Sequence, residues 1–264
     1  MKNFTKNISS FAGVFFVNDE YERCGLRKLI DNQLGLRAST KGYSYGNLTG
    51  NFFNLCLSGG ECAEDIQKHF RGTLEQIPDN PVASADTLLR CFNELAVENQ
   101  TVVFSSGKAY QFNINENFND LNIKSLLLTK QLEKGKFYDF DYDSQIIEYE
   151  KYDAKKIYKM NTGYFLGVAT IGDKIVYVEN RDGNANVKTA QAGTLKNAYI
   201  MLNNHGVYVN RSRMDAGSYA KDIVEVVDNY SQLFYICANK CESLTEEIRQ
   251  ITDWQTVEIN FRNY

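Results

Sequence analysis

The sequence predicts an α/β protein in which a mostly helical region, residues 1–134, precedes a mixed sheet, residues 135–264. Apolar residues recur at helical spacing before this boundary, whereas apolar and polar residues alternate along the chain after it. The segments after the boundary follow one another in the order β-β-β-α-β-α-β. This order predicts three antiparallel strands followed by two helix–strand units, because short connections and right-handed crossovers are the rule.

Four helices are expected in the first region. Apolar residues at helical spacing lie on the segments 26–34, 45–55, 88–96 and 121–132. Ser44 and Ser84 stand before two of these segments, where a hydroxyl can cap the first turn of a helix. The segment 101–112, TVVFSSGKAYQF, holds a turn-forming Ser-Ser-Gly between two apolar runs, and it predicts a short pair of strands.

The second region opens with the predicted strand FYDFDYD, residues 137–143. The apolar runs GYFLGVATI and KIVYVEN flank Gly172-Asp173, a pair typical of two-residue hairpin turns. A helix at 195–202, a strand at VYVN, a helix at 223–230 and a last strand at QLFYICAN follow. Three antiparallel strands followed by right-handed αβ units make the layout of an RNase H-like sheet, and this is the fold that the region predicts.

The composition excludes several classes of protein. No stretch approaches about 18 uncharged apolar residues, and the first residues lack the pattern of a secretory signal, so we expect a cytoplasmic protein. The six cysteines form no C-x-x-C pair and only two histidines occur, so a zinc site is not predicted. Because the net charge is −4, any contact with nucleic acid must come from local basic patches.

Three carboxylates stand at alternate positions of the first predicted strand. Asp139, Asp141 and Asp143 would face one side of the sheet, with aromatic residues on the other. Ionised carboxylates at this spacing repel one another and raise one another's pKa unless a counter-charge lies close by. A solvated edge strand and a bound divalent cation both remove the difficulty, and the pattern alone favours the solvated strand.

Asp215 changes this balance. It follows a buried-looking strand and precedes Ala216 and Gly217, small residues that let backbone or substrate approach closely. In the predicted sheet the first and fourth strands are parallel neighbours, which brings Asp141 and Asp215 side by side. Two converging carboxylates suit Mg²⁺ or Mn²⁺, and two such ions about 4 Å apart can drive phosphodiester cleavage and transfer. The alternative role for Asp215 is to cap the helix that follows.

Several segments, taken in order, resemble a bacterial insertion-sequence transposase of the DDE class over nearly the whole chain. They are FAGVFFVNDE with GLRKLIDNQLG, KGYSYGNLTGNFFNLCLSGGECAEDI, NPVASADTLLRCFNEL, YDFDYD, NTGYFLGVATIGDKIVYVENRDGNAN and RMDAGSY. YDFDYD is similar to the family's first-Asp strand, and RMDAGSY is similar to its second-Asp motif, Arg-x-Asp-Ser-Gly-Phe. The resemblance implies an RNase H-like core that uses Mg²⁺ or Mn²⁺, with two ions, for DNA cleavage and strand transfer at the ends of a mobile element.

Residue by residue, the resemblance implies that Asp141 is the first catalytic and metal-binding acid and that Asp215 is the second. Asp139 also matches a common acidic position, so the choice between Asp139 and Asp141 stays open. Where the family often has Thr two places after the first Asp, this chain has Asp143. Asp143 is therefore either a supporting residue near the metal or simply exposed.

The third acid of the family is a Glu on a helix beyond the fifth strand. Glu246, Glu247 and Glu258 are available, but none has the expected Tyr…Arg…Glu…Lys setting before the sequence ends at Tyr264. Charge patterning places Glu246 and Glu247 on the exposed face of a short helix. We therefore expect a catalytic core that lacks its third acid and has weak or no activity on its own.

Basic and polar residues near the predicted carboxylates are candidate DNA contacts, since phosphates require neutralisation. They are Lys151, Lys155, Lys159, Arg181, Asn184, Arg211 and Arg213. A solvated charge run is the alternative for these residues, and Arg213 has the further alternative of pairing with the acidic cluster. The resemblance implies double-stranded DNA as the partner, both terminal inverted repeats and target, bound by a homo-oligomer at the bacterial nucleoid.

Two other functions compete with that of a metal-dependent transposase core. The chain could be a non-catalytic, truncated transposase that only binds DNA or inhibits the full-length protein. It could also be an unrelated RNase H-like nuclease or resolvase, which would keep the two-Asp chemistry and lose the terminal-repeat partner.

Overall fold

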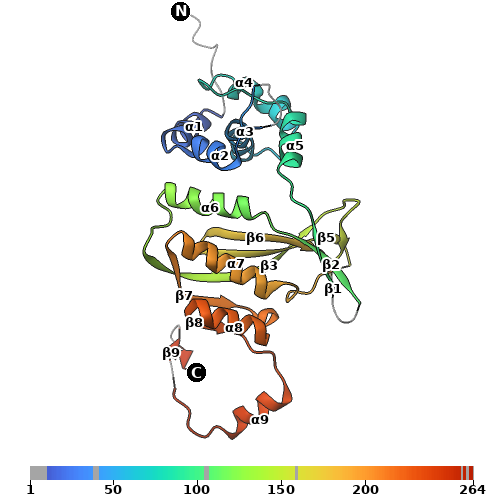
Figure 1. Cartoon of the computed structure of the whole chain (residues 1–264), viewed down its shortest axis with the longest axis vertical. Coiled ribbons are helices and arrows are strands. Elements are labelled where there is room, and N and C mark those ends of the chain that lie inside the picture. Colours follow the sequence, from blue (N-terminus) through green and yellow to red (C-terminus); the bar gives the residue numbers. More distant parts are fainter. Residues whose placement is uncertain are drawn as a thin grey trace, which may run out of the picture.

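The computed structural model describes residues 11–37, 42–103, 107–157 and 160–256, together with the backbone of 258–259 and 262–263. In Figure 1 a cluster of helices from the first third of the chain lies above a mixed sheet, and the last helix lies below that sheet. Among the described residues, no helix combines the length and the apolar character that crossing a membrane requires.

The helical cluster contains most of the helices that the apolar stripes predict. Its elements are α1 Gly13–Arg23, α2 Leu26–Leu34, α3 Tyr45–Leu57, a π-helical turn Ile66–Phe70 that continues into α4 Arg71–Leu74, and α5 Ala85–Glu94. The hydroxyls of Ser44 and Ser84 accept hydrogen bonds from the backbone amides of Asn47 at 3.1 Å and Thr87 at 3.3 Å, so both predicted caps are confirmed. Apolar side chains from all of these elements form one core.

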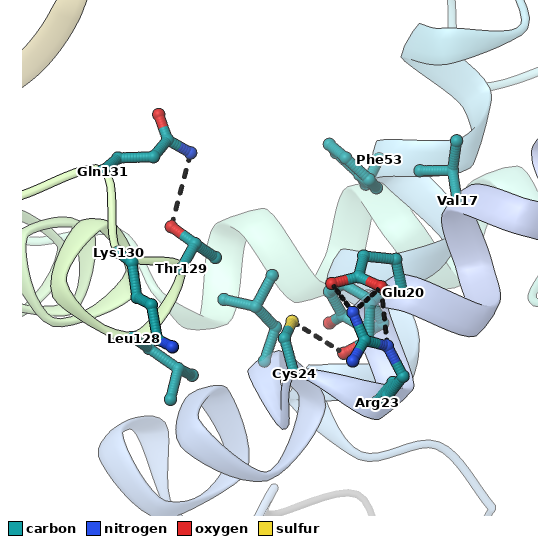
Figure 2. Close-up of a pocket in the computed structure, with 11 residues that line it drawn as sticks. Val17, Glu20, Arg23, Cys24, Phe53, Leu128, Thr129, Lys130 and Gln131 are labelled. Atoms are coloured by element: carbon teal, nitrogen blue, oxygen red, sulfur yellow. Dashed lines mark hydrogen bonds and ion pairs between the residues drawn. The ribbon is translucent and has the colours of Figure 1, made fainter.

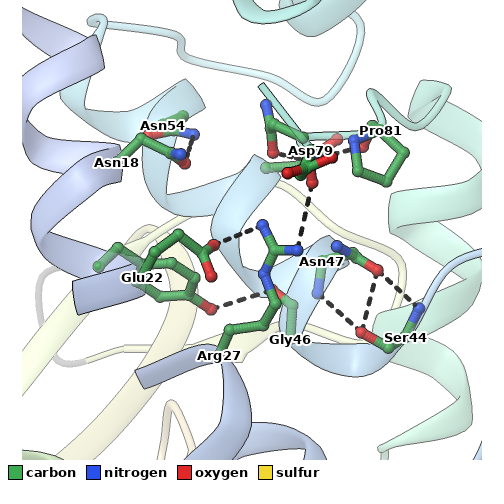
Figure 3. Close-up of polar contacts among 12 residues, drawn as sticks. Asn18, Glu22, Arg27, Ser44, Gly46, Asn47, Asn54, Asp79 and Pro81 are labelled. Carbon is green, nitrogen blue, oxygen red and sulfur yellow. Dashed lines mark hydrogen bonds and ion pairs between the residues drawn. The ribbon is translucent and has the colours of Figure 1, made fainter. Parts of the chain in front are cut away.

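Polar contacts fix the irregular segment between α4 and α5 inside the helical cluster. The buried amide of Asn51 donates to the carbonyl of Pro81 at 3.2 Å. Figure 3 shows Arg27 between Glu22, with which it forms an ion pair, and the carbonyl of Asp79, to which it donates at 3.2 Å. Because these bonds tie carbonyls of the segment to side chains of α2 and α3, they stabilise a loop that has no regular backbone pairing.

A mixed sheet of eight strands forms the second part of the molecule. Its strands are β1 Gln100–Val103, β2 Ala109–Asn113, β3 Lys136–Glu148, β4 Lys155–Lys156, β5 Thr162–Ile171, β6 Lys174–Asp182, β7 Val207–Met214 and β8 Ser231–Ile236. They lie in the order β1-β2-β6-β5-β3-β7-β8, with β4 paired to β5. From β1 to β3 neighbouring strands are antiparallel, whereas β7 is parallel to β3 and β8 is parallel to β7.

The helices α7 Gln191–Asn204 and α8 Lys221–Tyr230 make the two crossovers to the parallel strands. From β3 onward the elements follow the predicted order β-β-β-α-β-α-β, with the short β4 in addition, and the sheet is compatible with an RNase H-like fold. The predicted hairpin is also present, since β1 and β2 extend the sheet beyond β6.

One face of the sheet is packed and the other is half-exposed. Phe140 and Tyr142 of β3 lie in the core with apolar residues of α7 and α8. Because side chains alternate along a strand, the intervening carboxylates lie on the opposite face. The side chains of Asp139 and Asp141 are 31% and 32% exposed there. The predicted division of β3 into an aromatic face and an acidic face is confirmed.

The helix α6, Glu116–Leu128, packs against both parts of the molecule. Leu121 belongs to the core of the helical cluster, and Ile123 belongs to the core of the sheet. The side-chain amide of Gln33 in α2 donates to Asp120 of α6 at 2.8 Å. The same helix therefore forms part of the wall of both cores.

The last described elements are α9 Glu242–Gln250 and the paired strands β9 Glu258–Ile259 and β10 Arg262–Asn263. α9 buries none of its residues, and Figure 1 shows it apart from the sheet. Glu246 and Glu247 are exposed on α9, as predicted. Neither residue stands on the acidic face of β3.

Gly167 of β5 is tightly enclosed, and this gives a first prediction. A Cβ atom at this position would overlap the hydroxyl of Tyr142 and lie 2.6 Å from Glu179 Oε1. We expect Gly167→Ala to lower the free energy of unfolding by about 1–3 kcal/mol, because a close-packed core has to shift to admit a methyl group. The measurement is urea denaturation.

Gly193→Ala is the matched control for this substitution. Gly193 lies inside α7 with open space around its Cα, so alanine there should stabilise the helix by up to about 1 kcal/mol. Equal stability of the two variants would contradict the packing around Gly167.

Candidate functional site

Two acidic residues lie close to the point where the parallel pairing of β3 with β7 ends, at Tyr142 and Met214. In the register of these strands Asp141 pairs with Arg213. β7 ends at Met214 and Asp215 follows directly, two residues beyond the partner of Asp141. The expectation that the strands before these carboxylates are parallel neighbours is confirmed, so Asp141 and Asp215 stand on adjoining chain segments.

Two arginines of β7 offset the charge of the acids on β3. Arg211 donates to both oxygens of Asp139, at 2.9 and 2.6 Å, and Arg213 donates to both oxygens of Asp141, at 2.7 Å each. The Arg211 guanidinium holds the pKa of Asp139 below its usual range. The predicted repulsion is therefore relieved by the protein itself, and the alternative that Arg213 pairs with the acidic cluster is confirmed.

Asp215 has a different environment from the acids on β3. Its exposed carboxylate makes no hydrogen bond or ion pair with the residues that the structure describes, and it does not cap the turn Ala216–Ser218. The capping alternative is thus not observed. A Cβ atom on Gly217 would lie 3.0 Å from Asp215 Oδ1, so glycine at that position leaves room around the carboxylate. Asp215 can accept a ligand from solvent without giving up a protein partner.

The donors present fit a hydrated divalent cation in number and kind. Asp141 and Asp215 offer carboxylate oxygens, and Mg²⁺ in proteins is often held by one or two carboxylates while it keeps several waters. Asp141 has to release Arg213 to serve as a ligand. Asp143 is exposed, and its Oδ1 accepts a hydrogen bond from the backbone amide of Ser144 at 2.7 Å. Within the described parts of the chain, no three His, Cys, Asp or Glu side chains gather as a metal-binding group.

Most of the predicted DNA contacts are on the surface. The exposed members are Lys151, Lys155, Asn184, Arg211 and Arg213. The side chains of Arg211 and Arg213 are 47% and 57% exposed although both are paired with carboxylates. Lys155 belongs to β4, which pairs with the start of β5 beside the carboxyl end of β3. Lys159 lies outside the described residues.

Arg181 is the exception, because its side chain is 0% exposed. It forms an ion pair with Glu179, donates to the hydroxyl of Tyr142 at 2.5 Å and donates to the carbonyl of Val187. Thr194 of α7 donates to the second oxygen of Glu179. Burial lowers the pKa of Arg181. The prediction that Arg181 contacts DNA is wrong, because its guanidinium is enclosed and already committed to partners inside the protein.

A separate pocket of about 490 Å³ lies between the helical cluster and the end of α6 (Figure 2). Apolar side chains such as Val17 and Phe53 line it, and Glu20 and Arg23 form an ion pair of 2.6 Å along its edge. None of the predicted site residues belongs to this pocket. The sequence patterns give no signal for it, because it forms only where two parts of the chain meet.

Comparisons with known proteins do not identify this chain. No protein family matches the sequence, and no curated protein matches it. Among solved structures, the chain is similar to the Mos1 mariner paired-end complex with Mn over 94% of this chain and 81% of that one, with 11% identity and a TM-score of 0.28. A likeness of this size carries no argument about fold or function, and no match supports the bacterial insertion-sequence assignment.

The ion pair between Asp139 and Arg211 predicts a pH-dependent stability. Because the folded-state pKa of Asp139 is lowered, its contribution is complete above the ordinary value of about 3.9 and is lost as the pH falls through the folded value. We expect Asp139→Asn to flatten the loss of stability as the pH falls below about 4, by no more than about 1 kcal/mol for a surface pair. Urea midpoints across this range measure the effect, and a variant profile parallel to the wild type would contradict it.

Proposed function

We propose that this chain is the core of a DDE-type DNA transposase with an RNase H-like sheet. In this proposal Asp141 and Asp215 hold Mg²⁺ or Mn²⁺, and the enzyme cleaves and joins DNA at the ends of a mobile element in the bacterial cytoplasm. The observation that carries the proposal is the parallel pairing of β3 with β7, which gives the two carboxylates adjoining positions. The carboxylate of Asp215, which has no hydrogen-bond or ion-pair partner among the described residues, supports it further.

Arg213 at the site and the exposed polar residues farther along the sheet have roles that follow from their charge and polarity. A bound ion would supply polarisation of a phosphate oxygen and activation of a water or hydroxyl. Arg213 neutralises Asp141 when no cation does so, and its guanidinium becomes available to a phosphate oxygen once Asp141 turns to a cation. Lys151, Lys155 and Asn184 are exposed and suit contacts to the DNA backbone.

Activity of this chain alone should be weak. Glu246 and Glu247 lie on the exposed helix α9, and the described residues contain no group of three acidic or metal-binding side chains. A missing ligand reduces both the affinity for the ion and the activation of water. Assembly with a second copy on DNA belongs to the proposal as well.

The test is Mn²⁺ binding followed by DNA nicking. We expect wild-type protein to bind Mn²⁺ in a titration followed by electron paramagnetic resonance, and Asp141→Asn and Asp215→Asn each to weaken binding. Asp139→Asn is the matched control and decides which acid of β3 is the first ligand. Wild-type binding that neither Asp141→Asn nor Asp215→Asn changes would overturn the proposed site, and robust nicking of supercoiled plasmid would overturn the expected weakness.

A second candidate function is metal-independent DNA binding by a non-catalytic transposase fragment. The pairs of Arg211 with Asp139 and of Arg213 with Asp141 favour it, since they neutralise these two acids without any cation. A gel-shift titration of duplex DNA in the presence of a chelator separates the two functions. Tight binding that Asp215→Asn leaves unchanged, together with no Mn²⁺ binding, would favour this second function.

A further inference from the structure

A buried ion pair lies directly behind the acidic face. Glu179 and Arg181 stand at alternate positions of β6, and both side chains are 0% exposed. Arg181 donates to the hydroxyl of Tyr142 at 2.5 Å, and the same hydroxyl lies 3.0 Å from Glu179 Oε1. Tyr142 is the residue between Asp141 and Asp143 on β3. The pair therefore contacts the strand of the first candidate ligand from its core side.

The same arginine reaches the segment that precedes α7. Its other terminal nitrogen donates to the carbonyl of Val187. A Cβ atom on Gly217 would lie 3.3 Å from Val187 Cγ1, so the side chain of Val187 packs against the turn that follows Asp215. A chain of contacts thus leads from β3 through Arg181 to the neighbourhood of the second candidate ligand.

Two hydrogen bonds join the first residue of α7 and the segment before it to the turn after Asp215. The side-chain amide of Gln191 donates to the hydroxyl of Ser218 at 2.6 Å, and both residues are buried. Lys188 donates to the carbonyl of Tyr219 at 2.6 Å. The turn is consequently held by the segment 187–191, which Arg181 in turn anchors to the sheet.

We propose that Glu179 and Arg181 are positioning residues that hold the turn of Asp215 at a fixed place relative to Asp141, an inference that rests on the proposed function. A buried ion pair is a poor source of stability, because desolvation of two charges offsets their attraction, and apolar replacements are often as stable. Here the ion pair fixes the relative positions of the chain segments that it contacts. The planar guanidinium bonds to three partners on β3, on β6 and before α7, which a single ammonium on a flexible stem does not reproduce.

The experiment compares amide hydrogen exchange in the turn after Asp215. The amides of Ser218 and Tyr219 donate to carbonyls within this turn, at 3.2 Å each, and their exchange reports how firmly it is held. The test variant is Glu179→Leu with Arg181→Met, which removes both charges together so that neither is left buried alone. The matched control is Val176→Ala, a fully buried position on the same strand β6.

We expect the double variant to speed exchange of these two amides by about tenfold or more, beyond any change explained by its global stability. Val176→Ala should speed exchange of these amides only as much as its loss of global stability explains. Gln191→Ala serves as a second variant, because it cuts the bond to Ser218 without touching the buried charges, and it should speed exchange in the same turn. Exchange in the double variant that is no faster than its own global stability explains would overturn the proposal.

Mn²⁺ binding separates this result from the proposed function. If wild-type protein binds Mn²⁺ through Asp141 and Asp215, the double variant should bind it more weakly, and Val176→Ala should not. If wild-type protein binds none, the proposed metal site fails, while the exchange measurement still decides whether Glu179 and Arg181 hold the turn.

Discussion

Arg181→Met alone is expected to lower the free energy of unfolding by about 3–5 kcal/mol, the cost of removing one partner from a buried ion pair. Glu179 would be left with a negative charge at a side chain that is 0% exposed. Within the described parts of the chain, its remaining donors are the hydroxyls of Tyr142 and Thr194. The carbonyl of Val187 would lose its donor as well. Urea denaturation at neutral pH measures the loss.

The control for this prediction is the Glu179→Leu, Arg181→Met double variant. Because it leaves no unpaired charge, it should recover most of the stability that the single variant loses. A single variant as stable as the wild type would contradict the buried pair, and a double variant less stable than the single one would contradict the explanation from an unpaired charge.

Asp141→Asn is expected to weaken Mn²⁺ binding by at least about tenfold, because a neutral amide replaces a charged oxygen donor. Arg213→Ala is expected to act in the opposite direction. It removes the guanidinium that occupies both oxygens of Asp141, so a cation no longer has to displace it. Mn²⁺ titration of wild type and the two variants measures the expected decrease and the expected increase in affinity in one series.

Arg211→Ala is the matched control for this pair of substitutions. It removes an arginine of the same strand whose partner is Asp139. If Asp141 is the ligand, Arg211→Ala should change Mn²⁺ binding less than Arg213→Ala does. The reverse order would assign the first ligand to Asp139, and equal affinity in all variants would contradict a site on this face.

The sequence predicts the sheet well because its strands obey simple alternation. The period of two along β3 separates Phe140 and Tyr142 from the acids, and burial alone then decides which face packs. The turn at Gly172 has a positive φ of 62°, as its hairpin position requires. At these positions the local preferences of the residues agree with the fold, so the sequence pattern predicts the observed structure directly.

The helix ends are less predictable from apolar spacing. The stripe at 121–132 predicts a helix that includes Leu132, but α6 ends at Leu128. Lys130 has a φ of 58°, and the amides of Gln131 and Leu132 both donate to the carbonyl of Leu126. Leu132 is buried all the same, so its apolar character reports its place in the core rather than a place in the helix.

Strand order and the acidic cluster predict the neighbouring positions of Asp141 and Asp215 and the pairing of Arg213, but the burial of Arg181 was not predicted. Strand order gives the approach of Asp141 to Asp215, because parallel pairing follows from the element sequence. Arg181 follows an Asn and precedes an Asp, and three polar residues in a row predict the exposed end of a strand. The period of two does place it with Tyr177 and Glu179 on the packed face, and this is the signal that identifies a buried pair.

The helix α6 joins two hydrophobic cores that lie on opposite sides of it. Leu121 and Ile123 are two positions apart, and each is buried in a different core. Asp120, the residue directly before Leu121, is hydrogen-bonded by Gln33 of the helical cluster and by His205 at the end of α7. Any rotation of the helical cluster against the sheet would therefore have to break contacts that α6 makes with one of the two cores. The two parts are mechanically coupled through this helix.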